Sequence, residues 1–158
     1  MDICSYTSEY AVQLANIFQQ AVHAIDSTCY TQEQKEAWAP SPPDYLAWSK
    51  RLKNKNALMA MIDNTVVGFI ELDPDGHIDC MYTLPQYQNH GVASRLYEYI
   101  EAFAITMNIK RLYVEASLMA LPFFEKRGFI LLHKNEIKRH GTTLVNYSME
   151  KLIQPEDV

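Results

Sequence analysis

Long apolar runs, cysteine pairs and an excess of positive charge are all missing from this chain of 158 residues. No apolar stretch approaches the roughly 20 residues that a membrane-spanning helix needs, so we expect no membrane partner. The cysteines Cys4, Cys29 and Cys80 lie far apart and form no CxxC pair, which argues against a disulfide framework or a zinc site. Lys and Arg number 14 against 19 Asp and Glu, and a chain with a net charge of −5 is a poor candidate for binding a nucleic-acid backbone.

Residues 1–5 lack the basic segment and the apolar core of a secretory signal, and isolated cysteines are typical of reduced thiols. Together these observations predict a cytoplasmic protein. The length and the 48% content of hydrophobic residues predict one globular domain at 1–153, followed by a short C-terminal tail at 154–158. The acidic balance favours cationic or amine ligands, and an ordinary solvated acidic surface explains it equally well.

Hydrophobic periodicity and turn residues predict a mixed α/β order of elements. Thr31 with Gln34 fits a capping box, and Asp44 fits an N-cap. The helices are expected at 8–25, from Thr31 to 38, from Asp44 to 52, from 94 to about 107, and in a short segment that ends at Gly128. The strands are expected at 2–6, 57–63, 66–72, 77–83, 111–116, 129–138 and 142–152.

The segment 88–93, with the sequence QNHGVA, connects the strand at 77–83 to the longest predicted helix. A tight loop before a helix exposes backbone N–H groups, and together with the helix dipole these groups make an anion site. Gly91 allows the main chain to approach a diphosphate closely, and Ala93 keeps the mouth of the helix open. Taken alone, the same pattern also describes an ordinary strand-to-helix turn.

With this loop in its place, the chain resembles the GNAT superfamily of acetyl-CoA-dependent N-acetyltransferases. The family motif R/Q-x-x-G-x-G/A stands here as Gln88-x-x-Gly91-x-Ala93. The segment 120–129, ALPFFEKRGF, looks like the second CoA-binding segment of the family, which ends in a Gly-Phe pair. The order of elements matches over 1–152, nearly the whole chain.

The resemblance implies an α/β fold with a mixed, mostly antiparallel twisted sheet flanked by helices. In such a fold the strands that end at Thr83 and Ala116 splay apart and form the CoA cleft. The resemblance also implies that acetyl-CoA is the cosubstrate and that no metal takes part. The cofactor-binding residues it implies are Met81, Tyr82, Thr83, Gln88, Asn89, His90, Gly91, Val92, Ala93, Ser94, Ser117, Phe124 and Lys126.

One position departs from the family pattern. Many members carry a Tyr four residues before the Gly of the Gly-Phe pair, and this Tyr is thought to protonate the departing thiolate. Phe124 stands there and has no proton to donate. Three explanations stay open: a thiol with a pKa of about 8.5 leaves without a protein acid, water or Ser117 or another Tyr donates, or the domain binds CoA without efficient turnover.

Acetylation of an amine also requires a base, because an amine with a pKa of about 10.4 is protonated at neutral pH. The predicted strand at 77–83 places His77, Asp79, Met81 and Thr83 on one face. Asp79 is the first choice because it interrupts an apolar strand close to the expected thioester, and the alternative is a structural carboxylate that pairs with an Arg. His77 and Glu71 are the other candidates. The alternative for His77 is a surface residue at a turn, and the alternative for Glu71 is a solvated strand residue.

The acceptor is expected opposite CoA, over the N-terminal helices and the last strands. Tyr30, Trp38 and Tyr147 are the candidate substrate-binding residues of that region, and core packing is the alternative for the aromatic rings. The segments 30–40 and 146–152 are similar to a small, poorly assigned bacterial subgroup of the family.

The sequence therefore predicts an enzyme that moves an acetyl group from acetyl-CoA directly to the amine of a small molecule or peptide. No covalent intermediate is expected, because Cys80 falls on the other face of its strand and no His stands ready to activate it. The alternative is an acyl-CoA-binding or sensing domain with little or no catalysis. Dimers are frequent in the superfamily, so the resemblance allows a homodimer.

Overall fold

The computed structural model describes residues 1–53 and 55–153, so the tail predicted at 154–158 lies outside the described residues. Within these described residues, seven strands form two sheets in which every pairing is antiparallel. The first sheet has the order β1 (Asp2–Ser5), β2 (Asn56–Ile62), β3 (Thr65–Leu72) and β4 (Ile78–Thr83). The second sheet has the order β5 (Arg111–Ala116), β7 (Thr142–Leu152) and β6 (Ile130–Arg139). The predicted fold class is confirmed.

Five α-helices flank these sheets: α1 (Ala11–His23), α2 (Gln32–Trp38), α3 (Tyr45–Leu52), α4 (Val92–Thr106) and α5 (Leu121–Lys126), with 3-10 turns at Ser8–Tyr10 and Pro85–Tyr87. Both bonds of the predicted capping box are present at Thr31, and the Asp44 side chain accepts a hydrogen bond from the Ala47 N–H at 3.0 Å. The predicted helix at 8–25 is shorter, because its first turn is a 3-10 turn. No helix of the described residues is long and apolar enough to cross a membrane.

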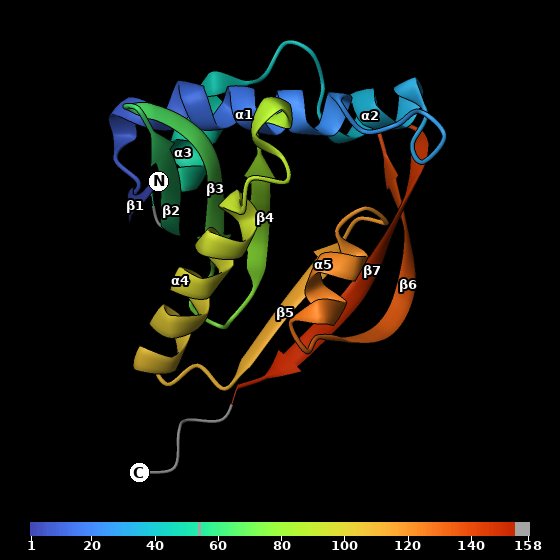
Figure 1. Cartoon of the computed structure of the whole chain (residues 1–158). Coiled ribbons are helices and arrows are strands. Elements are labelled where there is room, and N and C mark those ends of the chain that lie inside the picture. Colours follow the sequence, from blue (N-terminus) through green and yellow to red (C-terminus); the bar gives the residue numbers. More distant parts are fainter. Residues whose placement is uncertain (54, 154–158) are drawn as a thin grey trace.

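The first sheet carries the main core, with helices on both faces (Figure 1). Every residue of β3 after Thr65 is buried, which requires cover on both sides because side chains alternate along a strand. Gly68 faces α4, and a β-carbon added to it would lie 2.7 Å from the Val92 side chain and 3.4 Å from that of Leu96. The next residue, Phe69, faces the opposite side and packs against Trp48 of α3, with ring centroids 5.9 Å apart.

The two sheets touch at one end and part at the other, so that β4 and β5 form a V (Figure 1). At the closed end the Tyr113 N–H donates to the Gly76 carbonyl at 3.1 Å, and His77 pairs with Tyr113 in a single parallel bridge. Gly76 has a φ of +101°, and a β-carbon there would lie 1.9 Å from the Arg111 carbonyl oxygen. Only glycine fits this crossing. Beyond it β4 pairs only with β3 and β5 only with β7, as the predicted splay requires.

Candidate active site

The open end of the V contains a cavity that we call the splay cleft. It lies between β4, the start of α4 and the segment that follows β5, with the end of α1 along one side. Its lining comprises Ala21, Ala24, Ile25, Asp26, Trp38, Met81, Tyr82, Thr83, Tyr87, Gln88, Asn89, Gly91, Val92, Ala93, Ser94, Ser117, Met119, Ala120 and Phe123. Ten of the predicted cofactor-binding residues therefore line one cavity.

The start of α4 presents uncapped backbone donors to this cleft. Gly91 is the N-cap with a φ of +78°, no side chain caps the helix, and no acidic residue stands in its first turn. The backbone N–H groups of Val92, Ala93 and Ser94 are thus first-turn donors without an intrahelical acceptor. A β-carbon at Gly91 would meet no atom within 4 Å, so the space in front of this turn is open to a ligand.

The exposed edge of β4 adds a second set of backbone groups. The Leu84 N–H donates to the Val67 carbonyl of β3 at 2.8 Å. Because backbone groups alternate in direction along a strand, Tyr82 also faces β3, whereas Met81 and Thr83 turn their N–H and C=O groups toward the cleft. An extended ligand with amide groups could pair with this edge as an additional strand would.

Three predicted cofactor-binding residues do not line the splay cleft. His90 and Lys126 are exposed outside it, and Phe124 is buried in the core while its neighbour Phe123 forms the cleft wall. The cation beside α4 is instead Arg127, which donates to the Ser94 hydroxyl at 2.5 Å and lies 3.6 Å from the centroid of the Phe123 ring. The roles of these residues toward a ligand stay predictions.

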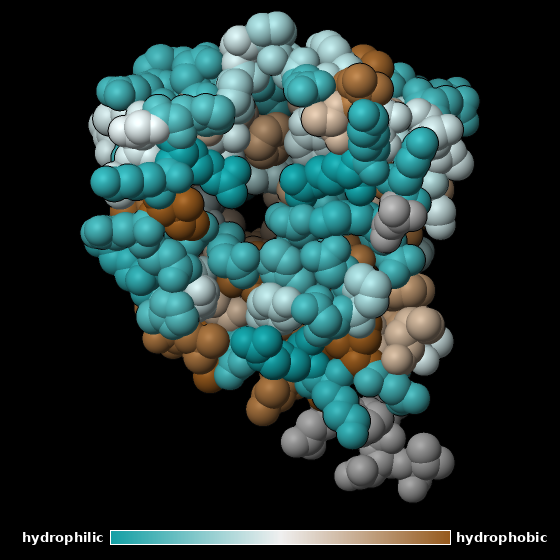
Figure 2. Space-filling view, turned by 180° about the vertical axis from the view of Figure 1, so that it is seen from behind, coloured by the Kyte–Doolittle hydropathy of each residue, from teal (hydrophilic) through white to brown (hydrophobic). Residues whose placement is uncertain are grey.

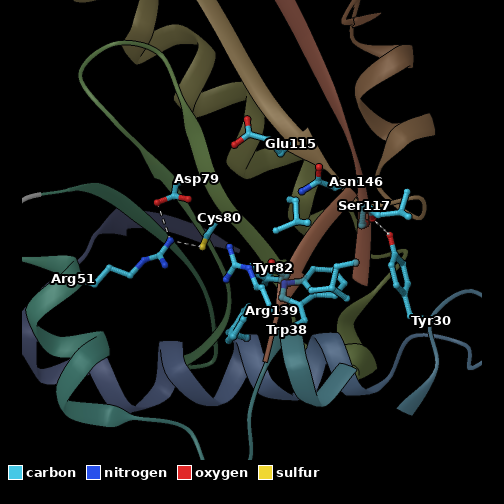
Figure 3. A pocket seen from close by; sticks show the side chains of 14 residues that line it. Tyr30, Trp38, Arg51, Asp79, Cys80, Tyr82, Glu115, Ser117, Arg139 and Asn146 are labelled. Atoms are coloured by element: carbon cyan, nitrogen blue, oxygen red, sulfur yellow. Dashed lines mark hydrogen bonds and ion pairs between the residues drawn. The ribbon is translucent and has the colours of Figure 1, made fainter. Parts of the chain in front are cut away.

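A second cavity, which we call the polar pocket, lies on the other side of β4 and β5 (Figure 3). Its lining comprises Phe18, Tyr30, Trp38, Arg51, Asp79, Cys80, Tyr82, Glu115, Ser117, Ile137, Arg139, Leu144, Val145 and Asn146. Trp38, Tyr82 and Ser117 line both cavities, so the two meet at the open end of the V. The rear face of the molecule is hollowed near its centre, with mostly hydrophilic residues around the opening (Figure 2).

Asp79 lies at the polar pocket in an ion-pair cluster. Its carboxylate contacts Arg51 at 2.9 Å and also accepts a hydrogen bond from Lys55. Burial raises the pKa of Asp79, but the Lys55 hydrogen bond and the charge of Arg51 outweigh it and leave the pKa below its usual value. This is the structural pairing that the sequence allowed as the alternative, and a carboxylate so stabilised is a weak base.

Glu71 is fully buried on β3 and lines neither cavity, so its interpretation as a solvated strand residue is wrong. Its carboxylate accepts a hydrogen bond from Arg51 at 3.1 Å, and burial raises its pKa. Arg51 also donates to the Cys80 sulfur at 2.9 Å. Cys80 thus faces Glu71 and Arg51, and burial holds the pKa of its thiol well above the usual value.

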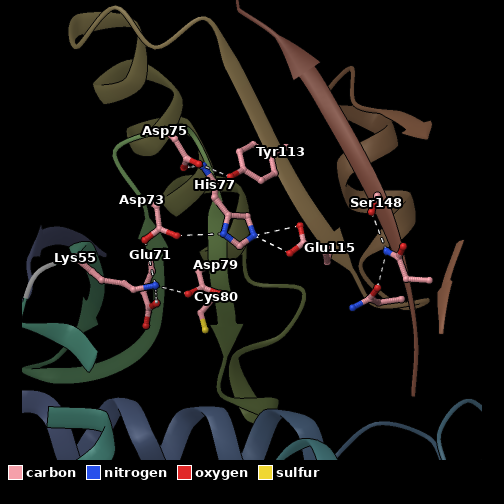
Figure 4. Close-up of polar contacts among 12 residues, drawn as sticks. Lys55, Glu71, Asp73, Asp75, His77, Asp79, Cys80, Tyr113, Glu115 and Ser148 are labelled. Carbon is pink, nitrogen blue, oxygen red and sulfur yellow. Dashed lines mark hydrogen bonds and ion pairs between the residues drawn. The ribbon is translucent and has the colours of Figure 1, made fainter. Parts of the chain in front are cut away.

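His77 links the two strands of the V through its imidazole ring (Figure 4). Nδ1 lies 3.1 Å from the Asp73 carboxylate, and Nε2 lies 2.9 Å from the carboxylate of Glu115 on β5. The hydrogen bond to Glu115 is the main reason that the pKa of His77 is raised; burial opposes it and Asp73 adds to it. Glu115 reaches the polar pocket, so it presents the proton-accepting end of an Asp–His–Glu series to whatever binds there.

The same region offers a spacing that suits a cation. One ligand atom each of Asp73, His77 and Asp79 lies within 4.8 Å of the others. The Lys55 ammonium contacts both carboxylates, at 3.1 Å from Asp73 and through the hydrogen bond to Asp79. The cluster thus already contains a cation supplied by the chain.

Two of the three predicted acceptor residues line the polar pocket. The Tyr30 hydroxyl donates to the Val145 carbonyl at 3.0 Å and accepts from the Leu118 N–H at 3.0 Å, so it connects the segment before α2 to the second sheet. Trp38 packs edge-on against Tyr30, with ring centroids 5.5 Å apart. Tyr147, opposite Ala116 in the sheet, does not line the pocket.

The charged and amide residues of the pocket that were not among the sequence-derived candidates are Arg51, Glu115, Arg139 and Asn146. Glu115 carried a usable signal, because the period of two in 111–116 places it with Tyr113 on the more exposed face of a strand that borders the V. Arg51, Arg139 and Asn146 carried none, since each comes from a different element whose partner is set by tertiary structure.

The model of the acetyltransferase (GNAT) domain family matches residues 26–151 of the chain. The chain is 32% identical to the "Uncharacterized N-acetyltransferase YafP" of Escherichia coli (strain K12) over 137 residues, covering 87% of this chain and 86% of that protein.

Solved structures agree with this assignment. The crystal structure of a GCN5-related N-acetyltransferase (Aminotransferase, Class-II) from Rhodopseudomonas palustris superposes with a TM-score of 0.91 at 32% identity, covering 96% of this chain and 95% of that one. The PaiA N-acetyltransferase from Thermoplasma acidophilum, solved in complex with coenzyme A, shares the fold with a TM-score of 0.75 at 18% identity over 96% and 98% of the two chains. The chain therefore belongs to the GNAT family of N-acetyltransferases and is an acyltransferase.

Proposed function

We propose that the protein transfers an acetyl group from acetyl-CoA directly to the amine of a small molecule or peptide. The splay cleft binds the coenzyme and the polar pocket binds the acceptor. The observation that carries the proposal is the junction of the two cavities at Trp38, Tyr82 and Ser117, where a thioester from one side meets an amine from the other.

The cleft suits a diphosphate joined to an extended amide chain. The first-turn N–H groups of α4 receive the diphosphate, and the open space at Gly91 lets it approach the backbone. The edge of β4 at Met81 and Thr83 pairs with the pantetheine amides. The Met81 N–H, which faces the cleft, is then positioned to polarise the thioester carbonyl. Acetyl-CoA supplies the activated acetyl group.

Glu115 and His77 form the base in this proposal. Glu115 takes the proton of the acceptor ammonium, directly or through one water, and shares it with Nε2 of His77 at 2.9 Å. Asp73 is a positioning residue, because its contact with Nδ1 holds the imidazole ring with Nε2 directed at Glu115. Asp79, the first choice from the sequence, suits this role less well because Arg51 and Lys55 neutralise it.

Ser117 and Tyr82 line both cavities, so in this proposal one of their hydroxyl groups donates the proton that Phe124 cannot supply to the leaving thiolate. The Ser117 oxygen already accepts from the Ala120 N–H at 3.2 Å, which leaves its own O–H free to donate. Tyr82 lines both cavities, and burial raises the pKa of its phenol, so it keeps its proton at neutral pH.

Thiol release from acetyl-CoA, measured with purified protein and a broad panel of primary amines, tests the proposal. We expect release that depends on the amine, together with a product whose mass increases by one acetyl group. Tight acetyl-CoA binding with no release above hydrolysis across the panel would favour the alternative, an acyl-CoA-binding domain, which Phe124 keeps open.

A further inference from the structure

The polar pocket contains a cation whose charge the described residues do not neutralise. Arg139, at the end of β6, lines this pocket, and among residues 1–53 and 55–153 no carboxylate lies within ion-pair distance of its guanidinium. Its neighbour two positions earlier, Ile137, lines the same pocket, whereas the intervening Lys138 does not. The alternation of β6 therefore turns the Arg139 side chain toward the pocket, although the residue as a whole is exposed.

The other charges of the pocket are already paired. Arg51 is bound to Glu71 and Asp79, and Asp79 is also bound to Lys55. Glu115 is in contact with His77, which is a cation only when protonated. A ligand of this pocket therefore meets one unpaired cation at Arg139 and one proton-accepting carboxylate at Glu115.

The surroundings of Arg139 favour an oxyanion as the group that pairs with it. In Figure 3 the guanidinium groups of Arg139 and Arg51 point toward each other from β6 and α3. The side-chain oxygen of Asn146 accepts from the Asn135 amide at 2.9 Å, and within the described residues the Asn146 amide nitrogen has no acceptor. A guanidinium fork, with an amide donor in the same pocket, suits the geometry of a carboxylate or phosphate.

We infer that the acceptor is an amine that also carries an oxyanion, an amino-acid-like small molecule. Arg139 binds its carboxylate or phosphate-type group, and Glu115 receives the proton of its amino group. This inference depends on the proposed function and narrows its substrate class. It excludes simple polyamines and amines without an oxyanion as the preferred acceptors. The negative net charge of the whole chain alone would favour such cationic amines.

Matched acceptors test the inference. L-amino acids are compared with the corresponding C-terminal amides, and 2-aminoethyl phosphate is compared with ethanolamine, by thiol release from acetyl-CoA. We expect the oxyanion-bearing member to have the higher kcat/KM. In Arg139→Ala this kcat/KM falls by about 10- to 100-fold, mainly through KM, while that of the neutral member changes little. The oxyanion is a carboxylate if Arg139→Ala lowers the kcat/KM of the amino acids, and a phosphate if it lowers that of 2-aminoethyl phosphate.

Lys138→Ala is the matched control, since it removes the same charge from the same strand but on the face away from the pocket. Equal transfer to both members of each pair, or equal losses in Arg139→Ala and Lys138→Ala, would overturn the inference and leave the proposed function standing. Absence of transfer to every amine of the panel would overturn both.

Discussion

The splay cleft and the polar pocket lie on either side of the same two strands, yet they are built in different ways. The cleft offers mostly backbone: the first turn of α4, the free edge of β4 and small residues such as Gly91 and Ala93. The pocket offers side chains instead, with charged or amide groups from α3, β4, β5, β6 and β7. A backbone site depends on the fold and on a few glycines, whereas a side-chain site can be rebuilt by single substitutions.

This difference indicates a division of labour. A cosubstrate can be bound by backbone groups, which the fold supplies whatever the other side chains are. An acceptor that differs from one enzyme to the next has to be selected by side chains. The substitutions below separate the two regions by their effects.

Gly91→Glu is expected to have the largest effect. The new side chain enters the open space before α4, places a negative charge at the proposed position of the diphosphate and strains a residue with a φ of +78°. Acetyl-CoA affinity, measured by calorimetry, should fall on the order of 1000-fold or more. Gly141→Glu is the control, because Gly141 has the same φ and the same free space but lies in the turn between β6 and β7. Near-normal affinity in a folded Gly91→Glu protein would refute the location of the diphosphate.

Glu115→Gln should damage the pocket and spare the cleft. Without a proton acceptor, kcat for amine acetylation should fall about 100-fold or more, while the affinity for acetyl-CoA stays unchanged. The loss should shrink as the pH rises and more of the acceptor amine is neutral. Glu136→Gln makes the same chemical change on β6 outside both cavities and should retain full activity. A pH-independent loss in Glu115→Gln would indicate that Glu115 only positions the acceptor.

His77→Gln should alter the pH dependence of stability. The folded-state pKa of His77 is raised, chiefly by Glu115, above the value of about 6.5 in the unfolded chain. A raised pKa means that protonation stabilises the fold, so the contribution is complete below about pH 6.5 and is lost as the pH rises through the folded-state pKa. In urea unfolding between about pH 6 and 9, the free energy of unfolding of the wild type should exceed that of His77→Gln by an amount that declines as the pH rises. The control is His133→Gln, at an exposed position, whose free energy of unfolding should follow that of the wild type at every pH. A difference between the wild type and His77→Gln that stays constant with pH would refute the protonated His77–Glu115 pair.

Cys80→Ala should have the smallest effect. Cys80 is buried beside Arg51, and its high pKa makes it a poor nucleophile. In direct transfer, kcat should stay within about threefold of the wild type, measured by thiol release. Loss of all acetyl transfer in a variant that still folds and binds acetyl-CoA would show that the acetyl group passes through the sulfur.

The sequence predicted most of the helices and strands because these rest on local signals, whereas the splay of β4 and β5 was implied by the resemblance to the GNAT family. Thr31 and Asp44 cap the expected helices, and the residues that expose the first turn of α4 are consecutive in the chain. The ends of elements shifted by a few residues, as at α1, where local propensity does not fix the first turn.

The polar pocket was harder to predict from local sequence patterns. The pairing of Asp79 with Arg51 and Lys55 depends on how α3 and the segment before β2 fold back onto β4, and no local pattern encodes that. For the same reason the burial of Glu71 was missed: one face of β3 is covered by helices whose position depends on the whole first half of the chain.

The two ends of the V are held together in different ways, by backbone at one end and by side chains at the other. The two sheets cross at Gly76. At the other end of the V, the Tyr30 hydroxyl is hydrogen-bonded to Val145 and Leu118 of the second sheet and the segment after β5. Because side chains such as Tyr30 and Gln34, rather than a ladder of strand pairing, connect the two sides at this end, we expect the separation of β4 and β5 there to change more readily than the crossing at Gly76.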